Sequence, residues 1–78
     1  MADIQSPLPG TFYQKPSPEE EPYKTAGDAV AAGDTVGLIE VMKTFIEVKA
    51  EAAGTFDAYV AENESAVTAG AVLARLQD

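Results

Sequence analysis

Apolar and polar residues alternate along residues 35–50, in two strand-like runs on either side of Met42 and Lys43. A period of two residues is typical of half-buried β-strands, so the segment predicts an antiparallel hairpin with Met42 and Lys43 as its turn. One side of this hairpin is largely apolar and holds the pairs Val41 with Thr44, Ile39 with Ile46 and Gly37 with Val48. The other side is mixed, can face water or a partner, and holds Glu40 with Phe45, Leu38 with Glu47 and Val36 with Lys49.

The predicted turn has an unusual sequence. Two-residue hairpin turns favour Gly, Asn or Asp, because these residues adopt positive φ angles at little cost. Met42 and Lys43 lack this freedom, and strain of about 1–3 kcal/mol tends to persist where function demands it. The sequence therefore points to a function at Lys43. The alternative is a longer or shifted turn in which Lys43 is an ordinary solvated residue.

Lys43 is poorly placed to act as a nucleophile by itself. An exposed lysine is almost entirely protonated at neutral pH, and activating it requires burial or cationic neighbours. Glu40 and Glu47 flank the predicted turn and provide neither. We interpret Lys43 as a residue that another enzyme modifies, and we expect no catalytic residue in this chain.

An internal repeat relates the two halves of the sequence. Gly10-Thr11-Phe12 recurs as Gly54-Thr55-Phe56, and Ala29-Val30-Ala31-Ala32-Gly33 recurs as Ala66-Val67-Thr68-Ala69-Gly70. Each copy is followed by a strand-like run, residues 36–41 or 72–76. The repeat predicts two similar β-units related by a pseudo-two-fold axis and packed as a sandwich, with equivalent turns at Gly33 and Gly70. A helical interpretation of the alanine-rich segments is disfavoured by their glycines and valines.

Two further segments complete the predicted strands. Residues 4–13 contain a Pro-Gly turn, which predicts two short strands on either side of it. Residues 55–60 alternate and predict a strand with Phe56, Ala58 and Val60 on one face.

Residues 14–23 contain Pro16, Ser17 and Pro18, a run of three glutamates and a third proline. Prolines and consecutive charges do not fit inside a sheet, so composition alone favours a solvated, partly disordered loop. This segment holds the seven residues by which the first half exceeds the second between the phenylalanine and the first alanine of each repeat.

Length and composition restrict the function. The 78 residues suffice for one small domain, residues 1–78, which we expect to be monomeric. The net charge of −8 argues against nucleic acid and anionic membranes as partners and suggests docking onto basic protein surfaces. The absence of cysteine and histidine excludes disulfides, the usual zinc sites and imidazole-assisted nucleophiles. Neither a signal peptide nor an apolar run long enough to span a membrane is present, so we expect a cytoplasmic location.

The sequence Glu40-Val41-Met42-Lys43 resembles the attachment motif of biotinyl domains, Glu-Ala-Met-Lys-Met, in which biotin is amide-linked to the lysine. Val41 replaces the usual alanine and Thr44 the usual second methionine. Lipoyl domains, the sister family, typically have Asp-Lys-Ala at this position, so Met42 favours biotin. The resemblance covers roughly residues 2–77 and is strongest to the biotin carriers of bacterial acetyl-CoA carboxylases, in which a Pro-Ser-Pro thumb loop between the second and third strands is thought to contact biotin.

This resemblance implies an all-β fold, a flattened barrel of two four-stranded antiparallel sheets. It also implies a non-catalytic carrier subunit. By this resemblance, a biotin protein ligase is expected to attach biotin to Lys43, a biotin carboxylase to carboxylate the biotin, and a carboxyltransferase to pass the carboxyl group to an acceptor. The expected acceptor is acetyl-CoA or a related acyl-CoA, as in fatty acid biosynthesis, and pyruvate or a urea-like compound are the acceptors that the sequence leaves open. Glu40 and Met42 are expected to be recognised by the ligase and partners. Residues 14–23, with Pro16, Ser17 and Pro18 as the element that corresponds to the thumb, are expected to contact biotin. The alternatives are a lipoyl carrier and an unmodified acidic β-module that binds a protein partner.

Overall fold

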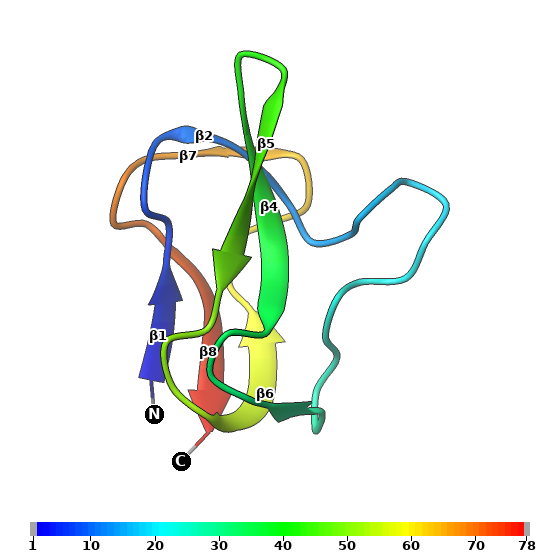
Figure 1. Cartoon of the computed structure of the whole chain (residues 1–78), viewed down its shortest axis with the longest axis vertical. Coiled ribbons are helices and arrows are strands. Elements are labelled where there is room, and N and C mark those ends of the chain that lie inside the picture. Colours follow the sequence, from blue (N-terminus) through cyan, green and yellow to red (C-terminus); the bar gives the residue numbers. More distant parts are fainter. Residues whose placement is uncertain (1, 78) are drawn as a thin grey trace.

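The computed structural model describes residues 2–77, which form eight β-strands and, within that range, no helix. The strands make two four-stranded antiparallel sheets, so the predicted all-β sandwich is confirmed (Figure 1). The strands are β1 (Ala2–Gln5), β2 (Gly10–Tyr13), β3 (Ala29–Val30), β4 (Thr35–Val41), β5 (Thr44–Lys49), β6 (Gly54–Tyr59), β7 (Ser65–Val67) and β8 (Val72–Gln77). Both short strands expected within residues 4–13 are present, in different sheets.

The strand order confirms the predicted pseudo-two-fold symmetry. One sheet runs β1-β8-β6-β3 and the other β5-β4-β2-β7, so a shift of four strands converts each order into the other. The repeated phenylalanines, Phe12 in β2 and Phe56 in β6, are both buried in the core between the sheets. Gly33 and Gly70 occupy equivalent turns with φ angles of 93° and 85°, which explains why both repeats require glycine there.

The symmetry extends to irregularities of the sheets. The pairing of β4 with β5 shifts at Val36, and that of β1 with β8 shifts at Leu73, the corresponding residue of the second half. Both side chains are fully buried. The predicted pairing of Val36 with Lys49 is therefore wrong: Thr35 pairs with Lys49, and the extra residue turns Val36 into the core.

A second irregularity corrects the expected face of β6. The pairing with β8 shifts between Phe56 and Ala58, so the strict alternation ends there. Phe56 is buried as predicted, but Ala58 and Val60 are exposed, and Tyr59 packs against the core in their place. The Tyr59 ring lies 4.8 Å from the ring of Phe56, centroid to centroid.

The hairpin of β4 and β5 extends beyond the rest of the sandwich at one end of the molecule, whereas β1 begins and β8 ends at the opposite end (Figure 1). The molecule measures 34 × 27 × 19 Å along its principal axes. The fold thus presents the turn between β4 and β5 as its most prominent projection.

Candidate functional site

The turn at the hairpin tip has the two-residue geometry that the pattern predicts. Five pairs lead up to it, from Gly37 with Val48 to Val41 with Thr44, in the predicted register. Met42 and Lys43 have φ angles of 50° and 67°, both in the left-handed region that type I′ turns require and that side-chain-bearing residues adopt at a cost. Met42 is 94% exposed and Lys43 is also exposed. The chain therefore holds a strained turn that presents its two side chains to solvent.

Lys43 differs from most cations of this acidic protein in having no partner among residues 2–77. Lys24 pairs with Asp34 at 3.2 Å, Lys49 with Glu47 at 3.8 Å and Arg75 with Asp3 at 3.6 Å. Within residues 2–77, Lys43 forms neither an ion pair nor a side-chain hydrogen bond. Its amine is accessible to an enzyme that approaches the tip.

The hairpin also positions the other residues of the predicted motif. Val41 is half-buried and packs against the core, and Thr44 is exposed beside the turn. Glu40 is half-buried, and its Oε1 accepts a hydrogen bond of 2.8 Å from the hydroxyl of Tyr13 on the neighbouring strand β2. The hydrogen bond to Glu40, together with desolvation and negative charge nearby, raises the pKa of Tyr13. The carboxylate of Glu40 is therefore held in place by β2.

Residues 14–23 form an irregular loop between β2 and β3 whose two ends are held together. The amide of Tyr23 donates to the carbonyl of Gln14 at 2.9 Å, which closes the loop at its base. Gln14 also donates from its amide to Asn63 Oδ1 at 2.7 Å and from its side chain to the carbonyl of Ala61 at 2.9 Å. The expectation of a merely solvated loop misses these anchors, because they come from a segment distant in sequence.

This loop and the hairpin sheet enclose a groove of about 320 Å³. Pro16, Ser17 and Pro18 line it from the loop. These are the residues that the resemblance to a thumb loop predicts to contact biotin. Lys15 of the same loop also lines the groove, and the remaining lining residues come from β2, β4, β5 and the segment before β7: Tyr13, Leu38, Phe45, Asn63 and Glu64. The rings of Tyr13 and Phe45 are 5.9 Å apart. The groove thus lies on the face of the hairpin that carries Phe45, two residues after Lys43 in sequence.

Several of these residues were not predicted from the sequence. Tyr13, Asn63 and Glu64 carry no local signal of their own, because only the pairing of β2 with β4 and β7 brings them beside the hairpin. Lys15 lies within the thumb-like residues 14–23 but was not singled out there. Phe45 and Leu38 were placed on the mixed side of the hairpin, and their exposure there, 56% for Phe45, was the available hint.

Comparisons with known proteins agree with the fold. The family model Biotin_lipoyl, described as "Biotin-requiring enzyme", matches residues 2–76. The chain belongs to this family. Within residues 2–77, this Biotin_lipoyl domain has no group of three acidic residues placed to hold a metal ion. The same residues contain no helix able to cross a membrane.

Curated relatives of this Biotin_lipoyl domain are biotin carboxyl carrier proteins of acetyl-CoA carboxylase. That of Nostoc sp. is 34% identical over 99% of this chain and 42% of its own length. That of Chlamydia muridarum is 41% identical over 94% of this chain and 45% of its own length. The chloroplastic protein 2 of Arabidopsis thaliana is 42% identical over 83% of this chain and 26% of its own length. The chain therefore spans less than half the length of these relatives.

Proposed function

We propose that this Biotin_lipoyl domain is the biotin carrier of a biotin-dependent carboxylase, with biotin amide-linked to Lys43. The observation that supports this most directly is the left-handed turn at Met42 and Lys43, in which an exposed lysine is held at the tip of a projecting hairpin. An Asn-Gly turn would adopt the same φ angles with less strain. Recognition of the Met42 and Lys43 side chains by a ligase would explain why the chain retains this strain.

The residues present fit the cofactor. The free amine of Lys43 can form the amide, and the adjacent groove combines apolar walls with hydrogen-bonding groups, as a bicyclic ring with a polar ureido edge requires. Biotin, when bound, supplies a ureido nitrogen that takes up and releases a carboxyl group. We assign Pro16, Ser17 and Pro18 to contact with the ring, and Glu40, Val41, Met42 and Thr44 to the surface that the ligase recognises.

The contribution of this domain is to tether the cofactor, and we propose that it has no catalytic step of its own. Attachment to an associated carrier raises the effective concentration of the cofactor at a partner site to the millimolar range for short flexible linkers. The rigid hairpin sets the point from which the arm swings. Its position at one end of the molecule lets a partner's active site receive the tip without enclosing the sandwich (Figure 1).

The partners that follow from this proposal are a biotin protein ligase, a biotin carboxylase and a carboxyltransferase. The names of the relatives favour acetyl-CoA as the carboxyl acceptor. The net charge of −8 favours basic docking surfaces on these enzymes. A monomeric domain and a cytoplasmic location remain predictions. A lipoyl arm is the second candidate that the family's fold permits, but the Met42-Lys43 sequence and the relatives favour biotin.

The test is the intact mass of the protein after co-expression with a biotin protein ligase. We expect one biotinyl group on the wild type and on Lys49→Arg, which alters a lysine at the far end of β5. We expect none on Lys43→Arg. Incubation of the product with biotin carboxylase, ATP and labelled bicarbonate should then transfer label to the protein. Failure to gain biotin, or a lipoyl-sized gain in cells that can lipoylate, would refute the proposal.

A further inference from the structure

Lys15 is a cation whose position the proposed attachment site does not explain. It is half-buried, and within residues 2–77 it forms neither an ion pair nor a side-chain hydrogen bond. Such a lysine is unusual in a chain with 13 acidic and 5 basic residues, in which Lys24, Lys49 and Arg75 all pair with carboxylates. A lysine at the wall of a groove that has no partner within residues 2–77 is a candidate for recognising an anion that arrives from outside.

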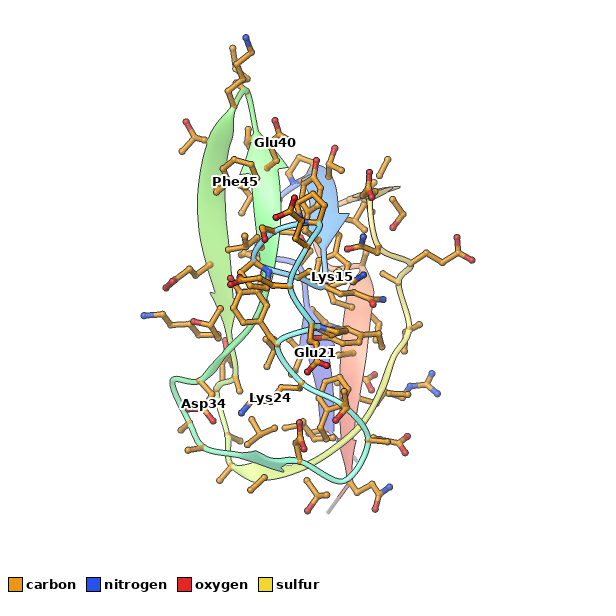
Figure 2. All side chains as sticks on the ribbon, turned by 90° about the vertical axis from the view of Figure 1, so that its right-hand side faces the viewer. Lys15, Glu21, Lys24, Asp34, Glu40 and Phe45 are labelled. Carbon is orange, nitrogen blue, oxygen red and sulfur yellow. The ribbon has the colours of Figure 1, made fainter. Side chains whose placement is uncertain are left out.

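The surroundings of Lys15 indicate the kind of anion. Lys15 lines the groove between the loop and the hairpin, whose walls include Tyr13, Leu38 and Phe45. Figure 2 shows Lys15 on the loop, with Phe45 and Glu40 higher on the hairpin. Aromatic and aliphatic walls with one ammonium suit a ligand that is mostly apolar and carries one negative group.

The groove lies within reach of a group attached to Lys43. Phe45 follows Lys43 by two residues in an extended strand, a rise of about 7 Å. A lysine side chain extended by the acyl arm of biotin is longer than this rise, so the ring can fold back onto the groove.

Building on the proposed function, we propose that Lys15 makes this groove a seat for the carboxylated ring and holds that anionic form more tightly than the neutral ring. The ammonium pairs with the added carboxylate while the ring lies against Tyr13 and Phe45. The groove then distinguishes a loaded arm from an empty one. The loaded arm is retained during transit between enzymes, and the empty arm is released.

Two carboxylates oppose the attraction of Lys15. Glu64 lines the groove, but its side chain is exposed, so water and salt screen its charge. Glu40 is half-buried beside Tyr13 and already accepts the hydrogen bond of the Tyr13 hydroxyl. We therefore expect the attraction of Lys15 to dominate for a carboxylate seated beside the lysine.

Pairing with Lys15 also slows spontaneous loss of the carboxyl group. In that reaction the bond between the ureido nitrogen and the carboxyl carbon breaks, CO₂ leaves, and the electron pair goes to the nitrogen, which takes a proton from water. Negative charge moves away from the carboxylate in the transition state. A cation held against the carboxylate therefore stabilises the ground state more than the transition state.

The experiment measures this loss in the absence of any carboxylase. Biotinylated protein is labelled with biotin carboxylase, ATP and labelled bicarbonate, freed of the enzyme, and followed for release of label. We expect Lys15→Gln to release label about two- to fivefold faster than wild type, the effect of a partly exposed ion pair. Lys15→Arg should behave as wild type, and added salt should narrow the difference.

Lys49→Gln is the matched control, because it removes the same charge outside the groove. Equal rates for wild type and Lys15→Gln, or an equal acceleration in Lys49→Gln, would overturn the assignment. Amide chemical shifts of Tyr13 and Phe45 give a second readout: carboxylation should move them in the wild type and much less in Lys15→Gln. Because every variant is first checked for biotin by mass, failure here is distinguishable from failure of the attachment proposal.

Discussion

The hydroxyl of Tyr13 donates a hydrogen bond to Glu40 Oε1 across 27 residues of sequence, at 2.8 Å. Tyr13 is the last residue of β2, directly before the loop of residues 14–23, and Glu40 lies in the strand that leads to Lys43. One contact therefore joins the base of the thumb-like loop to the hairpin that presents the lysine.

Removing the hydrogen bond between Tyr13 and Glu40 should lower the stability of the protein, and the effects of substituting the two residues should not be additive. We expect Tyr13→Phe to lower the free energy of unfolding by about 0.5–1.5 kcal/mol, because the half-buried carboxylate loses a donor. Urea denaturation of Tyr13→Phe, Glu40→Gln and the double variant tests this coupling. The double variant should lose less unfolding free energy than the sum of the losses in the two single variants. Strict additivity would mean that the hydrogen bond does not stabilise the fold.

Tyr59 should produce a pH-dependent loss of stability in alkaline solution. Its hydroxyl donates to the carbonyl of Val36 at 2.7 Å and accepts from the amide of Lys24 at 3.3 Å. Burial raises the pKa of Tyr59 from 10.0 to about 12. The folded protein thus retains the phenolic proton more strongly than the unfolded chain, so this stabilisation is complete below pH 10 and is lost as the pH rises towards about 12.

The comparison that isolates this effect uses Tyr59→Phe. At neutral pH this variant should lose about 1–3 kcal/mol of unfolding free energy, since two backbone groups lose their partner. Above pH 10 its stability should fall less steeply than that of the wild type. Tyr13 and Tyr23 also have raised pKa values, and both are unchanged in the variant. If the unfolding free energies of the variant and the wild type fell in parallel above pH 10, Tyr59 would not be the group responsible for the alkaline loss of stability.

Relieving the strain of the turn should raise the stability of the protein and abolish its biotinylation. Replacing Met42 and Lys43 by Asn and Gly supplies residues that adopt the observed φ angles of 50° and 67° readily. We expect a gain of about 1–3 kcal/mol in unfolding free energy, measured by chemical denaturation, with complete loss of biotinylation. Met42→Asn alone should retain the lysine, gain part of the stability and be a poorer ligase substrate. An unchanged or lower stability in the double variant would contradict the strain argument.

The repeated glycines that begin β2 and β6 offer a matched pair of substitutions. A Cβ on Gly10 would lie 2.6 Å from the carbonyl oxygen of Glu40 and 2.6 Å from Ile39 Cγ2. A Cβ on Gly54 would lie no closer than 3.1 Å, to the carbonyl oxygen of Gln77. We expect Gly10→Ala to cost about 1–3 kcal/mol and Gly54→Ala distinctly less. Thermal unfolding of both variants tests this order, and equal costs would contradict it.

The fold was largely predictable because its determinants are local or repeated. The two-residue turn fixed the hairpin register from Gly37 to Val48, and the repeat implied the symmetric strand order. The errors occur at bulges. The extra residue Val36 changes the pairing of β4 on the side away from the turn, and the extra residue Asp57 reverses the faces of the residues that follow it in β6. Neither bulge leaves a mark in the alternation of apolar residues.

The candidate site was predictable only where a motif carried it. Lys43 and its neighbours follow from a turn sequence that is unfavourable for its geometry. The partners of that hairpin, Tyr13 and Lys15, are ordinary residues whose importance depends on which strands are adjacent. Pairing between distant strands is set by the packing of the whole sandwich, which no short segment encodes.

The pseudo-two-fold axis makes the turn at Lys43 and the opening between β8 and β1 topologically equivalent. The first two strands in the order of one sheet are β5 and β4, which this turn joins, and those of the other sheet are β1 and β8. Ala2 already pairs with Leu76 as Ile46 pairs with Ile39. A circular permutant that links the β8 end to the β1 start and is opened between Met42 and Lys43 would keep every strand pair. Only the connectivity of the chain, and not the architecture, decides which end of this sandwich holds a modifiable lysine.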